Sequence, residues 1–248
     1  MTLLRNAFYL AWTDTRARYK KSVLGPLWLT LGNFIGVLGL SIVWANLLKE
    51  DMKTFVPSLT IGMIVWQLVA GSVGEGATTF IRQASIIRNV AIPYWFFVIR
   101  ALFRQIINLL HNLIIVIGVV WYFDLPLTVA AWLALPGILL VLANLFWMTY
   151  LLGMLGARFR DVEYLVNAFL PLLFFISPVM FRPDRLPVDM RIIWFNPLSY
   201  FIEVVRAPFV TSVPDVDSYL VMLAILFVGS AVTAVLVKHK GRQLAFWV

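Results

Sequence analysis

Stretches of about twenty apolar residues recur along this chain, and each is long enough to cross a lipid bilayer as a helix. The hydrocarbon core of a bilayer is about 30 Å thick, which a helix of roughly 20 residues spans. The sequence therefore predicts an all-α integral membrane protein with six transmembrane helices. The expected spans cover residues 27–48, 57–80, 95–122, 131–157, 165–181 and 219–237.

The overall composition agrees with a lipid environment. Of the 248 residues, 62% are hydrophobic and 13% are charged, whereas a soluble domain is roughly half apolar and about a quarter charged. The net charge is +8, but the basic residues flank apolar stretches and form no single patch, so nucleic acid is not expected as a partner. The chain has no cysteine, which excludes disulfides and cysteine-ligated metals, and no metal site is expected.

The distribution of Lys and Arg predicts the orientation. With six crossings both termini lie on one side, and the loops on that side together carry most of the basic residues. Because positive residues favour the cytoplasmic side, both termini are expected to be cytoplasmic. We expect a single membrane domain over residues 1–248, with five spans within 23–181, an outer segment at 182–217, and the sixth span and a cytoplasmic tail at 218–248.

Residues 1–22 precede the first span and are expected to form an amphipathic helix in the membrane interface. The segment holds too many charges for a cleavable signal peptide. Its apolar face repeats at three- and four-residue spacing and consists of Leu4, Phe8, Trp12, Thr15 and Tyr19. Arg16, Arg18 and Lys20 are placed to meet lipid headgroups. Membrane anchoring is the minimum role that this pattern predicts.

The outer segment, residues 182–217, is apolar rather than polar. Asn196-Pro197 is a strong helix start, since Asn caps helices and Pro suits the first turn. We expect short helices that dip back into the outer leaflet, buried against protein. Their aromatic residues are candidates for an outer gate, and the alternative is that they only cover the helix ends. These candidates are Trp194, Phe195, Tyr200 and Phe201.

Four separated pieces of sequence together resemble the polysaccharide and polyol-phosphate exporter permeases of the ABC-2 family, which export O-antigen, capsule or teichoic acid. They are residues 16–28, residues 157–163, Ser177-Pro178-Val179, and Asn196-Pro197-Leu198 followed by Glu203 and Arg206. The resemblance covers essentially the whole chain. It implies a homodimer in the bacterial inner membrane, docked on a separate ATPase subunit that uses ATP and Mg²⁺. The implied substrate is a glycan linked to polyprenyl pyrophosphate.

The resemblance also implies that two loops receive the motion of the ATPase. The first coupling loop, residues 80–93, is expected to form a short helix that ends before Pro93. The second coupling loop is residues 156–163. Ordinary charged caps at the membrane surface are the alternative for the second loop. The candidate coupling residues are Arg82, Gln83, Ser85, Arg88, Arg158, Arg160, Asp161 and Glu163.

The third expected span carries polar side chains at every fourth residue, which places them on one helical face. They are Arg100, Arg104, Asn108 and Asn112. Polar groups at this depth turn towards protein or a water-filled cavity. Hydrogen bonding between helices is favoured over a polar translocation surface. Contact of Arg100 and Arg104 with the pyrophosphate of the lipid-linked substrate is a third interpretation.

Other function classes fit less well. The chain lacks the G-x-x-x-x-G-K-[ST] loop that cradles nucleotide phosphates, so ATP hydrolysis is expected on another polypeptide and no cofactor on this one. A membrane-embedded transferase needs convergent acids, histidines or metal ligands. His111 and His239 are the two histidines of the chain, and no span holds paired carboxylates; no catalytic residues are expected. An exporter of drugs or small lipids stays an alternative, because fold does not fix substrate.

Overall fold

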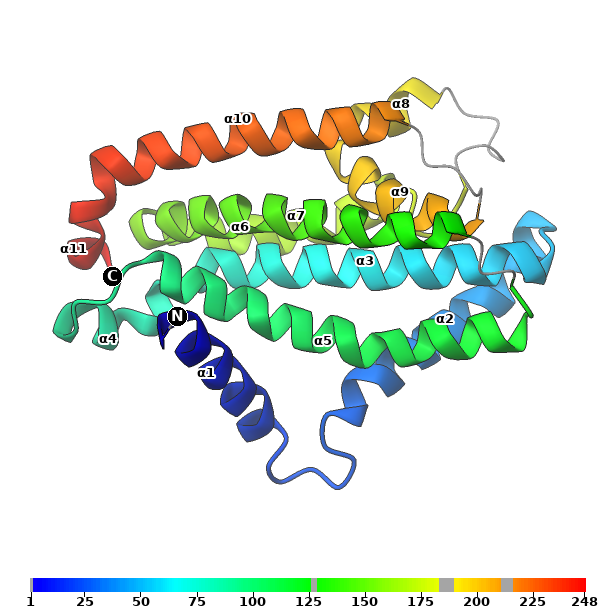
Figure 1. Ribbon diagram of the computed structural model, residues 1–248, viewed down its shortest axis with the longest axis horizontal. Helices are drawn as coiled ribbons and strands as arrows, with labels where there is room; N and C mark the ends of the chain where they lie inside the picture. The colour runs from blue at the N-terminus through cyan, green and yellow to red at the C-terminus, as the bar shows by residue number, and fades with distance from the viewer. Residues whose placement is uncertain (1, 126–128, 183–189, 211–215) are drawn as a thin grey trace.

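The computed structural model describes residues 2–125, 129–182, 190–210 and 216–248. Within these ranges all regular secondary structure is helical, which confirms the predicted fold class (Figure 1). The α-helices are α1 Thr2–Arg18, α2 Leu27–Leu48, α3 Met52–Thr78, α4 Ala84–Asn89, α5 Trp95–Tyr122, α6 Ala134–Arg158, α7 Asp161–Ile176, α8 Met190–Phe195, α9 Pro197–Val210, α10 Val216–Lys240 and α11 Leu244–Trp247. Short 3₁₀ helices are η1 Ile81–Gln83, η2 Val129–Leu133 and η4 Gly241–Gln243.

Five helices of the described chain are long and apolar enough to cross a membrane: α2, α3, α5, α6 and α10. The expected fifth span, residues 165–181, corresponds to α7, which has 16 residues and at 1.5 Å per residue falls short of the bilayer core. It ends at Ile176 rather than at Phe181, because Ser177 precedes Pro178 and adopts an extended backbone with ψ of 149°. A crossing at α7, and with it the total of six crossings, therefore stays a prediction.

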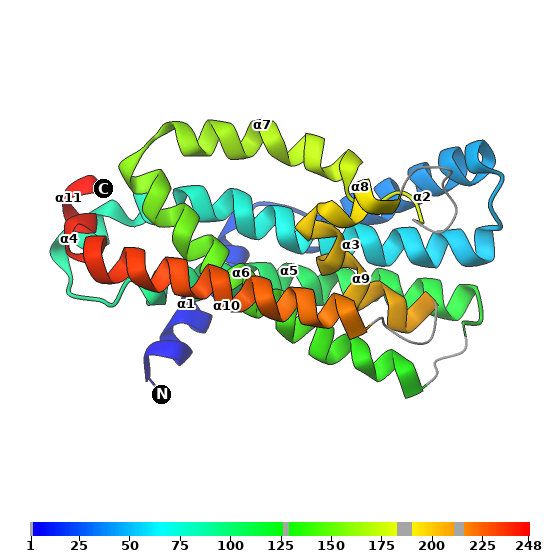
Figure 2. The same ribbon diagram turned by 90° about the horizontal axis from the view of Figure 1, so that it is seen from above.

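Helix α3 is the centre of the bundle. Within an 18-residue apolar stretch of this helix, 72% of the residues are buried. The helix packs against α2, α5, α6, α7 and α9 (Figures 1 and 2). Helix α2 is much less buried than α3: in the corresponding 18-residue stretch, 11% of its residues are buried. The buried side chains described on α2 recur every fourth residue and form one narrow stripe. They are Asn33, Val37, Ser41 and Ala45.

Glycines allow α3 and α6 to approach closely. A Cβ atom at Gly156 of α6 would overlap the carbonyl oxygen of Ala77, and one at Gly76 of α3 would lie 3.1 Å from the Cα atom of Thr149. Small residues have this role in lipid, where helices associate through close packing and not through a hydrophobic effect. By contrast, a Cβ at Gly32 of α2 would meet nothing within 4 Å, and one at Gly36 would lie 3.4 Å from the Met63 side chain.

Helix α1 confirms the expected N-terminal helix and packs against α5. Its small residues Ala7, Ala11 and Thr15 are buried, while Phe8 and Trp12 are about half exposed, at 48% and 47%. The chain then turns at Gly25, whose φ of +57° favours glycine. Figure 1 shows the ends of α1 and α2 nearest this turn projecting away from the other helices.

Short helices were expected in the outer segment, and its described residues contain α8 and α9. Asn196 caps α9, because its side-chain Oδ1 accepts a hydrogen bond from the backbone N of Leu198 at 3.1 Å. Helix α9 packs against α3, α6 and α10, and its residues Phe201, Ile202 and Val204 are almost fully buried. Residues 183–189 and 211–215 of this segment lie outside the described residues.

Candidate functional site

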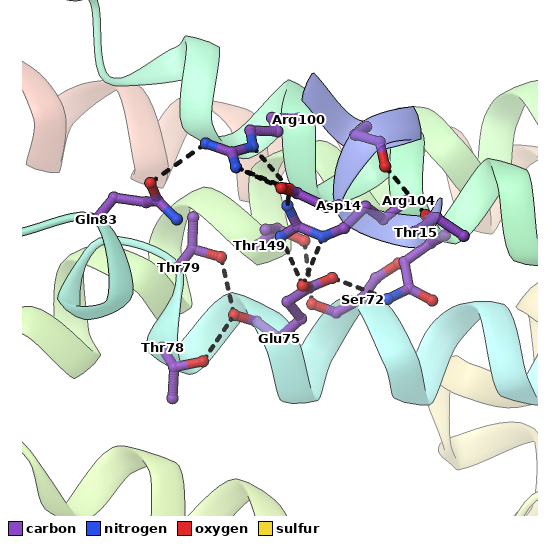
Figure 3. Close-up of polar contacts among 12 residues, drawn as sticks. Asp14, Thr15, Ser72, Glu75, Thr78, Thr79, Gln83, Arg100, Arg104 and Thr149 are labelled. Atoms are coloured by element: carbon purple, nitrogen blue, oxygen red, sulfur yellow. Dashed lines mark hydrogen bonds and ion pairs between the residues drawn. The ribbon is translucent and has the colours of Figure 1, made fainter. Parts of the chain in front are cut away.

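Two arginines of α5 and two carboxylates from α1 and α3 form one ion-pair network (Figure 3). Arg100 donates to both oxygens of Asp14, from Nε at 2.9 Å and from Nη2 at 2.8 Å. Arg104 bridges the two acids, donating from Nη1 to Asp14 at 2.9 Å and from Nε to Glu75 at 2.8 Å. The network joins α1 to the membrane helices α3 and α5.

The network is mostly shielded from solvent and its formal charges balance. The side chains of Glu75, Arg100 and Arg104 are 11%, 12% and 13% exposed, and that of Asp14 is 32% exposed. Gln105 donates to the other Glu75 oxygen at 2.9 Å, so both carboxylate oxygens are satisfied. Paired charges with satisfied hydrogen bonds are the form in which ions tolerate such an environment.

Of the three interpretations of the polar face, hydrogen bonding between helices describes Arg100 and Arg104 best. Both guanidinium groups are engaged by carboxylates of this chain, so binding of a lipid pyrophosphate by these arginines stays an untested prediction. The specific pairing of these arginines with Asp14 and Glu75 was not predicted from the sequence. The signal was present, because two arginines at this depth require counter-charges and Glu75 is the carboxylate of the adjacent expected span.

A polar cavity of about 260 Å³ adjoins this network. It is lined by Thr15, Arg18, Gly74, Glu75, Arg82, Arg104, Gln105, Asn108, Glu163 and Asn167. The headgroup candidate Arg18 and the coupling candidates Arg82 and Glu163 thus meet at one place. Arg16 and Lys20, the other headgroup candidates on this segment, have exposed side chains.

A cluster of side-chain amides continues the polar face along α5. Asn33 of α2 and Gln67 of α3 exchange hydrogen bonds through both amide groups, and Asn112 of α5 donates to Gln67 at 3.5 Å. The Thr30 hydroxyl also donates to the carbonyl oxygen of His111 at 3.2 Å. These contacts fasten the sparsely buried α2 to its neighbours.

The first coupling loop forms the short helix that was predicted, α4, preceded by η1. Arg82, Ser85 and Arg88 are exposed. Gln83 instead contributes to the ion-pair network, since its Oε1 accepts a hydrogen bond from Arg100 at 3.3 Å. The first coupling loop is therefore connected directly to the network.

The second coupling loop joins α6 to α7. Arg158 and Arg160 are exposed and reach residues 241–248, with the Arg158 guanidinium 5.6 Å from the Trp247 ring centroid. Asp161 and Glu163 lie in the first turn of α7, where the partial positive charge of a helix N-terminus favours acids. Docking of an ATPase by these residues stays a prediction.

At the other end of the bundle, pieces of sequence that carried the family resemblance meet in space. The Asn196 side chain donates to the Ser177 hydroxyl at 2.8 Å. Arg206, which is 4% exposed, donates to the carbonyl oxygen of Pro178 and to the Glu203 carboxylate, each at 2.6 Å. These bonds fix α9 to the turn that follows α7.

The four gate candidates do not form a single plug. Trp194 and Tyr200 pack together with ring centroids 5.2 Å apart. Phe201 is 1% exposed within the hydrophobic core, whereas Phe195 is 90% exposed. A gate built from these residues, which is still a prediction, would therefore centre on Trp194 and Tyr200.

The fold and these clusters define a multi-pass helical membrane protein in which an N-terminal helix is tied by ion pairs to the membrane helices. The chain belongs to the ABC-2 type transporter family, whose sequence profile matches residues 5–210. This match spans the network, both coupling loops and α9, and assigns the chain the role of a transport permease.

Curated relatives are similar over most of the chain. An O-antigen export system permease protein RfbA of Klebsiella pneumoniae is 24% identical over 206 residues, which cover 81% of this chain and 78% of that protein. A protein of the same name from Myxococcus xanthus is 23% identical over 221 residues, covering 86% of this chain and 83% of the relative. A second Klebsiella pneumoniae protein of that name is 23% identical over 197 residues.

Proposed function

We propose that this chain is the membrane permease subunit of an ATP-driven exporter that moves an O-antigen-like, lipid-linked polysaccharide across the bacterial inner membrane. The observation that carries the proposal is the similarity to O-antigen export permeases over 76% to 86% of the chain. The partners are a second copy of the chain, an ABC ATPase subunit that uses ATP and Mg²⁺, and a glycan on polyprenyl pyrophosphate.

The ion-pair network supplies a physical route for coupling. Gln83, close to α4, contacts Arg100, which binds Asp14 of α1. Arg104 extends the same network to Glu75 of α3. A displacement of the first coupling loop by the ATPase would therefore reach α1, α3 and α5 together, because buried charges separate only at high cost.

In this proposal α4, α11 and both termini lie in the cytoplasm, and α8 and α9 lie at the outer side. Arg206 holds α9 to the turn after α7, which gives the outer segment a fixed base. The Trp194 and Tyr200 rings are the proposed closing residues when no polymer occupies the path.

An exporter of small lipids is the second candidate, and a large apolar groove between α2 and α5 is compatible with it. The groove has a volume of about 940 Å³, and such a surface accepts hydrocarbon chains. Its lining includes Leu31, Phe34, Leu38, Ile114 and Val119. A polyprenyl tail and a simple acyl chain both fit this chemistry, so the groove alone does not choose between the substrates.

Substrate-stimulated ATP hydrolysis tests the choice. The permease is purified with its ATPase in nanodiscs, and hydrolysis is measured with polyprenyl-pyrophosphate glycan, with polyprenyl pyrophosphate lacking glycan, and with phospholipids or hydrophobic drugs. Selective stimulation by the glycan-bearing lipid is expected. Equal or stronger stimulation by phospholipids or drugs would contradict the polysaccharide assignment and support the second candidate.

A further inference from the structure

Residues 241–248, here called the tail, pack against both coupling loops. After α10 the chain forms η4 and α11, which lie beside α4 at one end of the bundle (Figures 1 and 2). Leu244 is 0% and Val248 is 3% exposed. They belong to a hydrophobic cluster with Ile87 of the first coupling loop and Ala157 of the second. The tail is therefore built into the same core as both loops.

Three arginines of the coupling loops also contact the tail. Arg88, in the last turn of α4, donates to the carbonyl oxygen of Val248. The guanidinium group of Arg158 lies 5.6 Å from the Trp247 ring centroid and 5.8 Å from that of Phe159, within the range of cation–π attraction. Arg160 makes a longer contact, 3.5 Å, to the Trp247 carbonyl oxygen.

The contact between Arg158 and Trp247 borders a cavity. A cavity of about 390 Å³ is lined by Arg158, Phe159 and Trp247 together with residues of α6 and α10. Next to this cavity, the second coupling loop contacts the tail through Arg158 and Trp247. Helix α4 contacts the tail through Arg88, which binds Val248, and through Ile87, which packs in one cluster with Leu244 and Val248.

We infer that the tail is a positioning element that fixes the two coupling loops to each other, so that a push on either loop moves both. The inference rests on the proposed function, since it assigns the loops to an ATPase interface. Arg88 and Arg158 are 70 residues apart in the chain, and the tail contacts both. Without this link, the ATPase would move one loop while the other lags, and hydrolysis would continue with less export.

The test compares Trp247→Ala and Leu244→Ala with Phe246→Ala in the reconstituted permease–ATPase complex. Phe246 is 88% exposed and serves as the matched control within the tail. Both test variants are expected to retain bound ATPase and hydrolysis within about twofold of wild type, with export per ATP lowered at least fivefold. Trp247→Phe is expected to restore coupling, because phenylalanine still offers a ring to Arg158.

A cross-linking experiment is the second part of the test. Because this chain has no native cysteine, the reagent reacts within it only at the introduced positions. In the double variant Arg88→Cys/Val248→Cys, a short bis-thiosulfonate reagent links the two cysteines and so spans the distance that the arginine side chain bridges in the wild type. Export per ATP is expected to be low before cross-linking and to recover afterwards. Failure to recover in the cross-linked complex, or unchanged export per ATP in both alanine variants, would overturn the inference. A wild-type complex that neither binds ATPase nor exports glycan would instead contradict the proposed function.

Discussion

Glu75→Gln should destabilise the folded permease measurably, because it removes a charge from the centre of the ion-pair network. The Glu75 and Arg104 side chains are 11% and 13% exposed, and their contact is 2.8 Å from Nε to Oε1. An uncompensated buried charge costs roughly 3–5 kcal/mol. Asp14 still accepts a bond from Arg104 at 2.9 Å, and glutamine keeps an acceptor. The expected loss of unfolding free energy is therefore about 1.5–3 kcal/mol, the range of a hydrogen bond to a charged group.

Unfolding in mixed detergent micelles, titrated with a denaturing detergent, measures this loss. The double variant Glu75→Gln/Arg104→Gln should lose less than the sum of the single losses, because each single change leaves a partner unpaired. Asp51→Asn is the control: Asp51 caps α3 through the backbone N of Lys53 at 3.2 Å, and asparagine caps equally well. Stability of Glu75→Gln within about 0.5 kcal/mol of wild type, or strictly additive losses, would refute an energetically coupled network.

Three further predictions follow from packing and topology. Gly156→Ala should lower stability by about 1–3 kcal/mol through overpacking against α3, and wild-type unfolding would contradict the close contact. Phe201→Ala should lower the free energy of unfolding by about 3–5 kcal/mol, because it truncates a core side chain. Trp194→Ala should instead fold normally and raise ion conductance in reconstituted vesicles. Unchanged conductance would remove Trp194 from the gate. An impermeant thiol reagent on intact cells should label Asp189→Cys but not Lys240→Cys, and the reverse pattern would invert the topology.

Much of the fold could be predicted because apolar length and helix signals are local. The spans expected at 27–48 and 95–122 coincide with α2 and α5, since a proline closely precedes each stretch and a charged residue closely follows it. The start of α9 at Pro197 followed from the preference of Asn and Pro for helix starts. The predicted end of the fifth span was wrong, because Phe181 continues an apolar run beyond the break that Pro178 imposes at Ser177.

The site was harder to predict because its partners come from distant elements. Helical spacing placed Arg100 and Arg104 on one face, but it could not show that Asp14, 86 residues before Arg100, reaches them. Asp14 occupies the polar side of an amphipathic pattern, where solvent is the ordinary neighbour. Likewise, the role of Gln83 in this network and the contact of Trp247 with Arg158 depend on tertiary packing that no local pattern encodes.

The most direct test of the account is translocation itself. The permease and its ATPase are reconstituted in inside-out proteoliposomes with polyprenyl-pyrophosphate glycan in the outer leaflet, and the fraction of glycan protected from an added glycosidase is followed with time. The account predicts that protection grows only with ATP and Mg²⁺, and that an ATPase variant unable to hydrolyse ATP abolishes it. Glycan that stays fully accessible in a complex that hydrolyses ATP and moves other lipids would contradict the account.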